Sequence, residues 1–158
     1  MGSRQTIITF SEKNLSDYSK DDQELIANAH SSLKNAYAPY SGFKVGCAVA
    51  LSSGRIITGN NQENAAYPSG LCAERVALFA AKSQYKEPIA TIVVLAQTSA
   101  GHPANAFSCG NCRQVMMEYA SQQSEPIRIL MLTEQDTYIE LTNVKELLPF
   151  HFNSESLR

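Results

Sequence analysis

Four residues constrain this chain more than any other feature of its sequence. Cys72 and Glu74 stand two positions apart, and Cys109 and Cys112 form a Cys-x-x-Cys pair further along. Residues three apart lie on one side of a helical turn, so both sulfurs of the pair can reach the same ion. A catalytic Zn²⁺ takes three protein ligands and keeps its fourth position open. The three cysteines therefore predict a catalytic zinc site.

Glu74 is close to that site in sequence without being needed as a ligand. Zinc acidifies a water molecule, and a neighbouring carboxylate can accept the proton and pass it on. A purely structural zinc site normally has four ligands, whereas this pattern provides three. We therefore expect Glu74 to act as the general base and acid of an enzyme.

The Cys-x-x-Cys pair alone is compatible with several roles. It could be a redox dithiol, a fragment of a zinc ribbon, or two unrelated thiols. A thioredoxin-like dithiol usually follows a strand, but here the polar segment 98–105 precedes the pair. The Cys-Ala-Glu motif at the start of an earlier predicted helix favours zinc. The remaining cysteine, Cys47, lies in an apolar run, and we interpret it as a small buried hydrophobic residue.

Length and composition indicate one ordinary globular domain. The chain has 158 residues, of which 44% are hydrophobic and 18% charged. A net charge of −2 without a basic stripe argues against a nucleic-acid polymer as partner. The apolar stretch 89–96 is far too short to span a membrane, and no signal-peptide pattern follows Met1. We expect a cytoplasmic protein with no membrane partner.

Hydrophobic periodicity predicts an α/β fold, specifically a single-domain three-layer α/β/α sandwich with a mixed, largely buried central sheet. We divide the chain into an N-terminal arm (1–20), a domain (21–152) and a C-terminal tail (153–158). The predicted strands cover residues 43–51, 55–59, 89–97, 127–133 and 138–141. The predicted helices cover the segment between Ser19 and Pro39, then 71–83 and 109–122, with a last helical turn at 144–148.

Several details of packing follow from the same patterns. Strand 89–97 is apolar throughout, so it should be central and buried on both faces. Helix 71–83 places its apolar residues Val76, Phe79 and Ala80 on a common face. Ser19 and Ser108 are expected N-caps, and helix 109–122 should direct Val115 and Tyr119 inward.

Both metal-binding segments are predicted to begin helices. Helix N-termini present free N–H groups and partial positive charge, which lower the pKa of thiols. Three thiolates against one Zn²⁺ still leave a net charge of −1, which weakens the metal as a Lewis acid. Arg75 and Arg113 directly follow Glu74 and Cys112, so either arginine could hydrogen-bond a thiolate and offset that charge.

Taken together, these residues resemble the cytidine deaminase family, specifically its small, homotetrameric, three-cysteine branch. The resemblance covers about residues 22–152 and depends on five blocks in family order. The blocks are residues 39–46 (PYSGFKVG), 61–68 (NQENAAYP), 72–75 (CAER), 109–115 (CGNCRQV) and 147–152 (LLPFHF).

The resemblance implies a hydrolytic deaminase of cytidine and 2′-deoxycytidine that serves pyrimidine salvage. One Zn²⁺ per chain would be held by Cys72, Cys109 and Cys112, with Glu74 moving protons between water, ring and leaving amine. Asn61 and Glu63 match positions that bind the ribose hydroxyls, and Phe43 and Phe152 match aromatic positions. The complete set of implied substrate contacts is Phe43, Asn61, Glu63, Ala65, Tyr67 and Phe152.

The resemblance also implies a homotetramer with shared active sites, in which Phe152 reaches a neighbouring subunit. The chain departs from the family at Ser108, where proline is usual, and at Gln62, where an aliphatic residue is usual. Two other functions remain open from the sequence. One is deamination of a nucleotide, a nucleoside antibiotic or a polynucleotide. The other is a zinc-stabilised module without catalysis.

Overall fold

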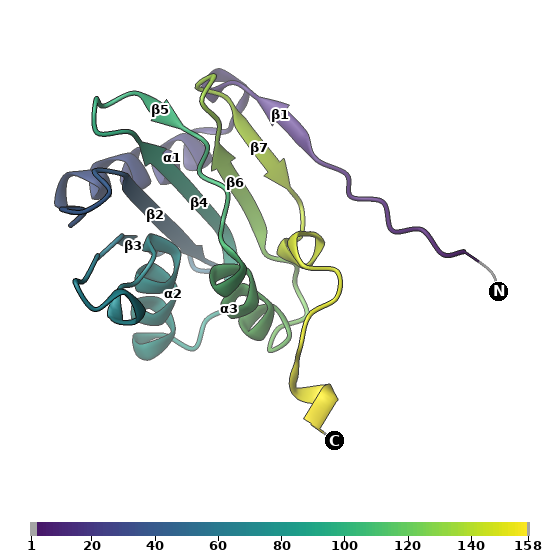
Figure 1. Cartoon of the computed structure of the whole chain (residues 1–158). Coiled ribbons are helices and arrows are strands. Elements are labelled where there is room, and N and C mark those ends of the chain that lie inside the picture. Colours follow the sequence, from purple (N-terminus) through teal and green to yellow (C-terminus); the bar gives the residue numbers. More distant parts are fainter. Residues whose placement is uncertain (1–2, 158) are drawn as a thin grey trace.

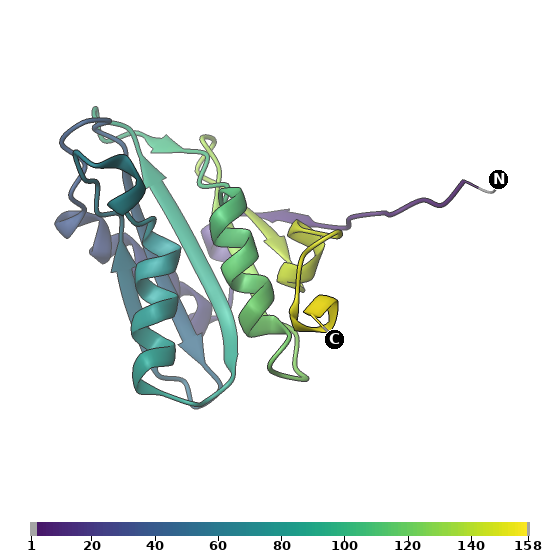
Figure 2. The same cartoon turned by 60° about the horizontal axis from the view of Figure 1, so that its bottom comes forward.

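A computed structural model describes residues 3–157 of the chain. Within these residues, seven strands form one mixed sheet between two layers of helices (Figures 1 and 2). Helix α1 (Lys20–Ser32) covers one face, and α2 (Ala73–Gln84) and α3 (Gly110–Ala120) cover the other. The predicted three-layer α/β/α architecture is confirmed.

The strands follow the order β1-β7-β6-β4-β2-β3 across the sheet, and β5 pairs with β4 outside this path. Strands β4 and β6 run parallel and the other pairs antiparallel, which makes the sheet mixed. Their bounds are β1 Ser11–Lys13, β2 Lys44–Leu51, β3 Ile56–Asn60, β4 Ile89–Gln97, β5 Pro103–Ala104, β6 Arg128–Leu132 and β7 Tyr138–Leu141.

Strand β4 forms the middle of the core, as the sequence predicts. It lies between β2 and β6, and Ile92 to Leu95 are at most 1% exposed. A strand with helices over both faces must be apolar on both faces, because neither row of side chains meets water. The continuous apolar run at 89–96 therefore reflects its central position.

Two glycines allow the helices to approach the sheet closely from opposite sides. A Cβ on Gly59 of β3 would lie 2.5 Å from the backbone nitrogen of Ala77 in α2. A Cβ on Gly46 of β2 would lie 2.3 Å from the carbonyl oxygen of Ala29 in α1. Neither distance is compatible with a real side chain. The close contact at Gly59 fixes α2, and with it Cys72, against the sheet.

This close packing also determines which face of α2 is buried. The face that carries Val76, Phe79 and Ala80 is not the buried one, because Phe79 is 41% exposed and the other two are only half-buried. A helix that packs directly on glycine can place only small side chains in the contact. The buried residues are therefore Ala73, Glu74, Ala77, Leu78 and Ala81.

Helix α3 confirms its predicted position but not its predicted cap. It begins at Gly110 with Cys109 as the N-cap residue, and no side chain caps it. The prediction that Ser108 caps it is therefore wrong. Val115 and Tyr119 pack against the core but are only half-buried, so their predicted inward orientation holds in part. The fully buried side chains of α3 are those of Cys112, Met116, Met117 and Ala120.

The N-terminal segment is only partly an arm. Residues 3–10 have no regular structure, are exposed, and extend away from the domain (Figure 1). Residues Ser11–Lys13 form β1, which pairs antiparallel with β7, so the sheet begins inside the predicted arm 1–20. At the other end, the predicted tail 153–158 contains one 3-10 turn over Ser154–Leu157. Residues 1–2 and 158 lie outside the described part of the chain.

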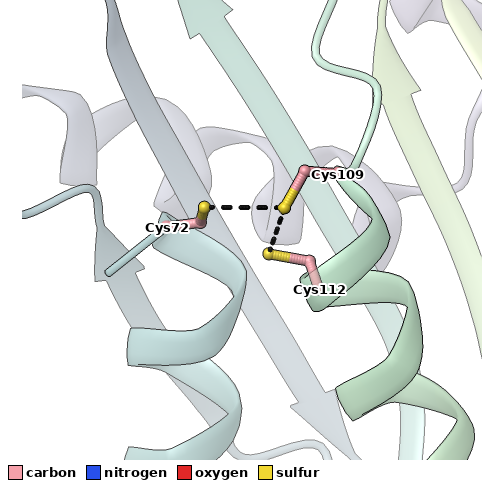
Figure 3. Close-up of side chains that lie close together, drawn as sticks. All are labelled: Cys72, Cys109 and Cys112. Carbon is pink, nitrogen blue, oxygen red and sulfur yellow. Dashed lines mark hydrogen bonds between the residues drawn. The ribbon is translucent and has the colours of Figure 1, made fainter. Parts of the chain in front are cut away.

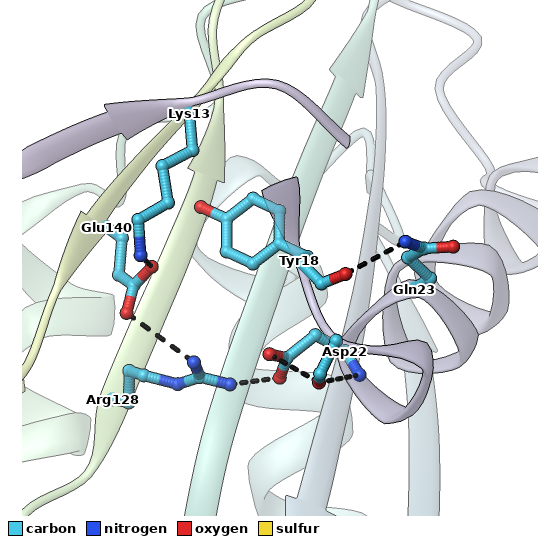
Figure 4. A network of polar contacts seen from close by, with 7 residues as sticks. Lys13, Tyr18, Asp22, Gln23, Arg128 and Glu140 are labelled. Carbon is cyan, nitrogen blue, oxygen red and sulfur yellow. Dashed lines mark hydrogen bonds and ion pairs between the residues drawn. The ribbon is translucent and has the colours of Figure 1, made fainter. Parts of the chain in front are cut away.

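A network of charged residues holds together the elements at the β1–β7 edge of the sheet (Figure 4). Glu140 of β7 is 7% exposed and accepts hydrogen bonds from Lys13 Nζ at 2.7 Å and Arg128 Nη1 at 3.5 Å. Arg128 also forms an ion pair with Asp22 in the first turn of α1. Ser19 caps that helix as predicted, because its Oγ accepts from the Asp22 backbone nitrogen at 3.2 Å. The network joins β1, β6, β7 and α1.

Candidate metal centre and active site

The starts of α2 and α3 lie side by side on one face of the sheet and bring three sulfurs together (Figure 3). Cys72 is the N-cap residue of α2, Cys109 is the N-cap residue of α3, and Cys112 lies in the first turn of α3. The Sγ atoms of Cys72 and Cys109 are 3.8 Å apart, and those of Cys109 and Cys112 are 3.6 Å apart. All three sulfurs lie within 4.8 Å of one another.

These distances fit a tetrahedral zinc site. Two sulfurs bound to one Zn²⁺ at about 2.3 Å lie about 3.8 Å apart when the geometry is tetrahedral. The cysteines are free thiols rather than disulfide partners. Residues 3–157 contain no second cluster of three such metal-binding side chains. Cys72, Cys109 and Cys112 would thus hold one Zn²⁺ per chain and leave one coordination position for a small ligand.

The surroundings favour a negative charge on Cys72. Its pKa is lowered to about 5, chiefly by a hydrogen bond with Cys112, with a further contribution from Arg75. The same hydrogen bond, together with burial, raises the pKa of Cys112. The surroundings therefore favour the thiolate form of Cys72 over that of Cys112. The free N–H groups at the starts of α2 and α3 act in the same direction as Arg75.

The two arginines expected to balance charge have different positions. Arg75 directs its Nη2 to Cys72 Sγ at 3.9 Å and to the Gly70 carbonyl at 3.3 Å, so it can offset thiolate charge. Arg113 instead donates to two carbonyls, those of Ser108 at 2.8 Å and Leu147 at 3.1 Å. Within residues 3–157 it makes no hydrogen bond to sulfur, so the expected thiolate contact is absent there. Arg113 connects the start of α3 to the C-terminal segment.

Glu74 lies in the first turn of α2 and is 4% exposed. Burial raises the pKa of its carboxyl group, because an apolar environment disfavours the charged form. A carboxylate with a raised pKa holds a transferred proton more firmly than a solvated one does. This position beside the three sulfurs gives Glu74 the properties of a group that carries protons.

A cavity of about 700 Å³ opens in front of the metal centre. Its volume lies within the range of small-molecule sites, about 300–1,000 Å³. The lining includes the metal-site residues Cys72, Cys109 and Glu74, and four of the six expected substrate contacts, namely Phe43, Asn61, Glu63 and Tyr67. The other two do not line it. Ala65 is exposed in the loop, and Phe152 is 59% exposed near the C-terminus.

Asn61 is held in place by the start of β2. Its Oδ1 accepts from the Val45 backbone nitrogen at 2.8 Å, and its Nδ2 donates to the Phe43 carbonyl at 2.9 Å. A primary amide has two N–H donors and two acceptor lone pairs, so one of each remains available. Asn61 can therefore fix the wall that carries Phe43 and still bind a hydroxyl in the cavity.

Glu63 fixes the loop at Tyr40 and Ser41 in a similar way. Its carboxylate accepts from the backbone nitrogens of Tyr40 at 2.9 Å and Ser41 at 3.3 Å, and from the Ser41 hydroxyl. The bond from the Ser41 hydroxyl is the main cause of the lowered pKa of Glu63. Glu63 thus remains a carboxylate, a form that accepts hydrogen bonds and donates none.

Sequence reasoning missed several residues of the cavity wall. Tyr40, Asn105 and Phe107 are among those that also line the cavity. Tyr40 belongs to the motif at 39–46, and its ring packs edge to face with that of Tyr67 at 6.4 Å. Asn105 and Phe107 belong to the loop just before Cys109. An aromatic residue two positions before a metal ligand was the available signal for that loop.

Comparison with known proteins assigns the class to which this site belongs. The sequence model described as "Cytidine and deoxycytidylate deaminase zinc-binding region" matches residues 19–124. The chain is also 39% identical over 137 residues to a cytidine deaminase of Halalkalibacterium halodurans, covering 87% of this chain and 98% of that protein. A cytidine deaminase of Sporosarcina psychrophila is likewise 39% identical over 137 residues, with 87% and 95% covered.

Solved structures give the same result. A cytidine deaminase from Burkholderia pseudomallei superposes with a TM-score of 0.70 at 37% identity, covering 82% of this chain and 98% of that one. A cytidine deaminase from Mycobacterium tuberculosis gives a TM-score of 0.65 at 29% identity, with 85% and 98% covered. The fold and the three-cysteine centre are those of a zinc-dependent deaminase. The chain belongs to the cytidine and deoxycytidylate deaminase family.

Proposed function

We propose that this protein hydrolyses cytidine and 2′-deoxycytidine to uridine and 2′-deoxyuridine, with release of ammonia, in pyrimidine salvage. The observation that carries the proposal is the position of Glu74, which is buried beside three clustered cysteine sulfurs at the wall of a cavity large enough for a nucleoside. A zinc module without catalysis would have no use for a buried, proton-carrying carboxylate in the cavity.

Cys72, Cys109 and Cys112 would hold the Zn²⁺, which when bound would act as a Lewis acid and lower the pKa of the attacking water. Glu74 accepts a proton from that water as its oxygen bonds to C4 of the cytosine ring, and delivers the proton to ring N3. Glu74 then carries the second proton of the water to the amino group. The C4–N bond breaks and ammonia leaves. The two protons of the water thus end on N3 and on ammonia.

The cavity walls support the substrate contacts that the sequence predicts. Phe43 is 37% exposed and lines the cavity, where its ring can pack on the pyrimidine. The remaining N–H of Asn61 and the carboxylate of Glu63 can hydrogen-bond the ribose hydroxyls, and Tyr67 lines the same cavity. Arg75 offsets thiolate charge through its contact with Cys72.

The charges in the cavity wall favour a nucleoside over a nucleotide. Among the lining residues, the charged side chains are those of Glu63, Glu74 and Arg75. Arg75 already contacts Cys72 Sγ and the Gly70 carbonyl, so it is committed to the metal centre. A phosphate would therefore meet two carboxylates and no free cation, which opposes binding.

Side-by-side turnover rates test the proposal. Zinc-loaded protein is incubated with cytidine, 2′-deoxycytidine, cytidine monophosphate and single-stranded DNA, and products are separated by chromatography. We expect uridine and deoxyuridine from the nucleosides and much slower turnover of the monophosphate and the DNA. Absence of uridine from a sample with one zinc per chain would refute the proposed reaction. A preference for the monophosphate would refute only the substrate assignment.

We further propose a cytoplasmic homotetramer whose active sites are completed by neighbouring chains. Among the described residues no helix has the length and apolar character to cross a membrane. Phe79, Phe150 and Phe152 are 41%, 91% and 59% exposed, and such apolar surface favours self-association. Phe152 does not line the cavity of its own chain, which leaves it free to reach that of a neighbour.

Substitution of Phe152 tests the shared site. If its ring contacts substrate in a neighbouring subunit, Phe152→Ala should raise KM for cytidine several-fold and leave the zinc content unchanged. Phe10→Ala is a suitable control, because this ring is also exposed but lies in the N-terminal arm. Light scattering during the assay reports the assembly state. A fully active monomer would refute the shared-site proposal.

A further inference from the structure

Phe107 presents an apolar ring to the cavity in front of the metal centre. Its side chain is 50% exposed and lines that cavity, two positions before the expected metal ligand Cys109. Cavities that bind small molecules are lined mainly by apolar and aromatic side chains, which contact the faces and edges of the ligand. The position of this ring therefore raises the question of which part of a bound nucleoside it would contact.

The burial pattern around Phe107 shows which way its side chain points. Ala106 and Ser108 are 4% and 3% exposed, whereas Asn105, Phe107 and Cys109 are exposed at the cavity. An alternation with a period of two is that of an extended chain, in which successive side chains point to opposite sides. The ring of Phe107 thus lies on the same side of its segment as the Cys109 sulfur.

Both neighbours of Phe107 are held by hydrogen bonds. The backbone nitrogen of Ala106 donates to the carbonyl of Leu132, the last residue of β6, at 2.9 Å. The carbonyl of Ser108 accepts from Arg113 Nε in α3 at 2.8 Å. The sheet and the helix therefore fix the backbone of this segment, and a ligand that enters the cavity meets a preorganised wall.

The ring also lies close to the reacting end of the cavity. Two residues of extended chain span at most about 7 Å, so the Cα atoms of Phe107 and Cys109 are no further apart than that. In the proposed reaction C4 of cytosine must reach the metal centre. Phe107 is therefore beside the base, whereas the ribose would be bound by Asn61 and Glu63 from the loop after β3.

The direction of proton transfer determines which edge of the base faces Phe107. N3 and C5 are the two ring neighbours of C4 and lie on opposite sides of it. Glu74, the proposed proton donor to N3, is in the first turn of α2, so N3 faces α2. The start of α3 lies beside that of α2 (Figure 3), and Phe107 is in the segment that enters α3. C5 consequently faces Phe107.

We propose that Phe107 is a specificity-determining residue whose ring packs against the C5 edge of the cytosine base. The inference rests on the proposed function. An aromatic side chain in this place favours an apolar C–H at C5 and restricts the size of any substituent there. Phe43 lines the same cavity, so the base would contact aromatic side chains from two separate segments.

Binding of the product tests this contact without using turnover. Calorimetry gives the Kd of zinc-loaded wild type, Phe107→Ala and Phe107→Leu for uridine and for 5-methyluridine. Wild type should bind uridine about tenfold more tightly than 5-methyluridine, because an added methyl group overpacks a filled contact. Phe107→Ala should weaken uridine binding about tenfold and bind 5-methyluridine at least as tightly as uridine. Phe107→Leu, which keeps apolar bulk, should be intermediate.

Phe10→Ala provides the control, because this ring is 57% exposed in the N-terminal arm and should affect neither Kd. An unchanged uridine Kd in Phe107→Ala, or an unchanged preference between the two nucleosides, would overturn the proposal. A changed assembly state in light scattering with unchanged Kd values would do the same, since it would assign the ring to a subunit interface. Wild type that binds uridine but does not convert cytidine would refute the proposed reaction instead, and the Kd values would still decide the contact.

Discussion

The charged network at the β1–β7 edge and the cysteine cluster at the starts of α2 and α3 differ in how their ionisable groups are paired. At the edge, Glu140 contacts two cations, Lys13 and Arg128, and Arg128 also contacts Asp22. Every charge in that network has a partner of opposite sign. The cluster contains three sulfurs and lies beside a buried carboxylate. Among the described residues, Arg75 is the one cation that contacts a sulfur, that of Cys72.

This difference separates a structural role from a functional one. Charges that are paired within the fold need no bound ion or ligand to neutralise them. Several groups that can carry negative charge around an open cavity can be balanced by a cation that binds there, as the three cysteines would bind Zn²⁺. The family's sequence model points the same way. It matches residues 19–124, which include the whole cysteine cluster but only Asp22 of the edge network.

Removing a sulfur should have the largest effect. Cys109→Ala leaves two thiolates, too few for a stable zinc site, so we expect loss of both the bound zinc and the turnover of cytidine. Zinc is measured by elemental analysis of dialysed protein. Cys47→Ala is the control, because this buried thiol lies outside the cluster and its loss should leave the zinc in place. One zinc per chain in Cys109→Ala would show that the ligand set is wrong.

Breaking the edge network should affect stability and not catalysis. Glu140→Gln leaves Lys13 and Arg128 without their shared carboxylate, and we expect the free energy of unfolding to fall by about 1–3 kcal/mol. Denaturant unfolding measures this loss, and kcat should remain at the wild-type value. Glu24→Gln, on the exposed side of α1, should change neither quantity. A fall in kcat of Glu140→Gln would mean that the two regions are not independent.

The edge should also respond to alkaline pH. Burial, with a smaller effect of the Asp136 charge, raises the pKa of Tyr138 from its ordinary 10.0 to about 12. Above pH 10 the unfolded chain loses this proton before the folded one does. Stability is therefore complete below pH 10 and falls as the pH rises toward about 12. Tyr138→Phe should lose less stability over this interval. Parallel unfolding curves for the two proteins would contradict the assignment.

The sequence predicted those parts of the molecule that depend on spacing and on continuous apolar runs. Strand 89–97 was recognisable because a strand buried on both faces has no polar side. Cys72, Cys109 and Cys112 were recognisable because helix starts and metal geometry restrict which spacings can work. Both features are local in sequence, and the structure only had to bring two helix starts together.

The remaining features depend on long-range packing. The buried face of α2 consists of small residues because Gly59 admits nothing larger, and hydrophobicity alone favoured Phe79. Strand β1 has no apolar pattern, because its Lys13 forms an ion pair with Glu140, which is distant in sequence. The position of Phe107 in the cavity wall likewise depends on the approach of the loop before α3 to Tyr40 and Glu63, which are distant in sequence and line the same cavity. None of these relations can be found within a short window of sequence.

The most direct test of the central claim compares wild type with Glu74→Gln at equal zinc content. The amide is nearly isosteric with the carboxylate but cannot carry a proton, and loss of such a group slows turnover about 10²–10⁴-fold. We expect Glu74→Gln to retain one zinc per chain and its unfolding midpoint while its kcat for cytidine falls by at least that range. A kcat near the wild-type value in the zinc-loaded variant would contradict the assignment of Glu74 and the functional interpretation of the unbalanced cluster.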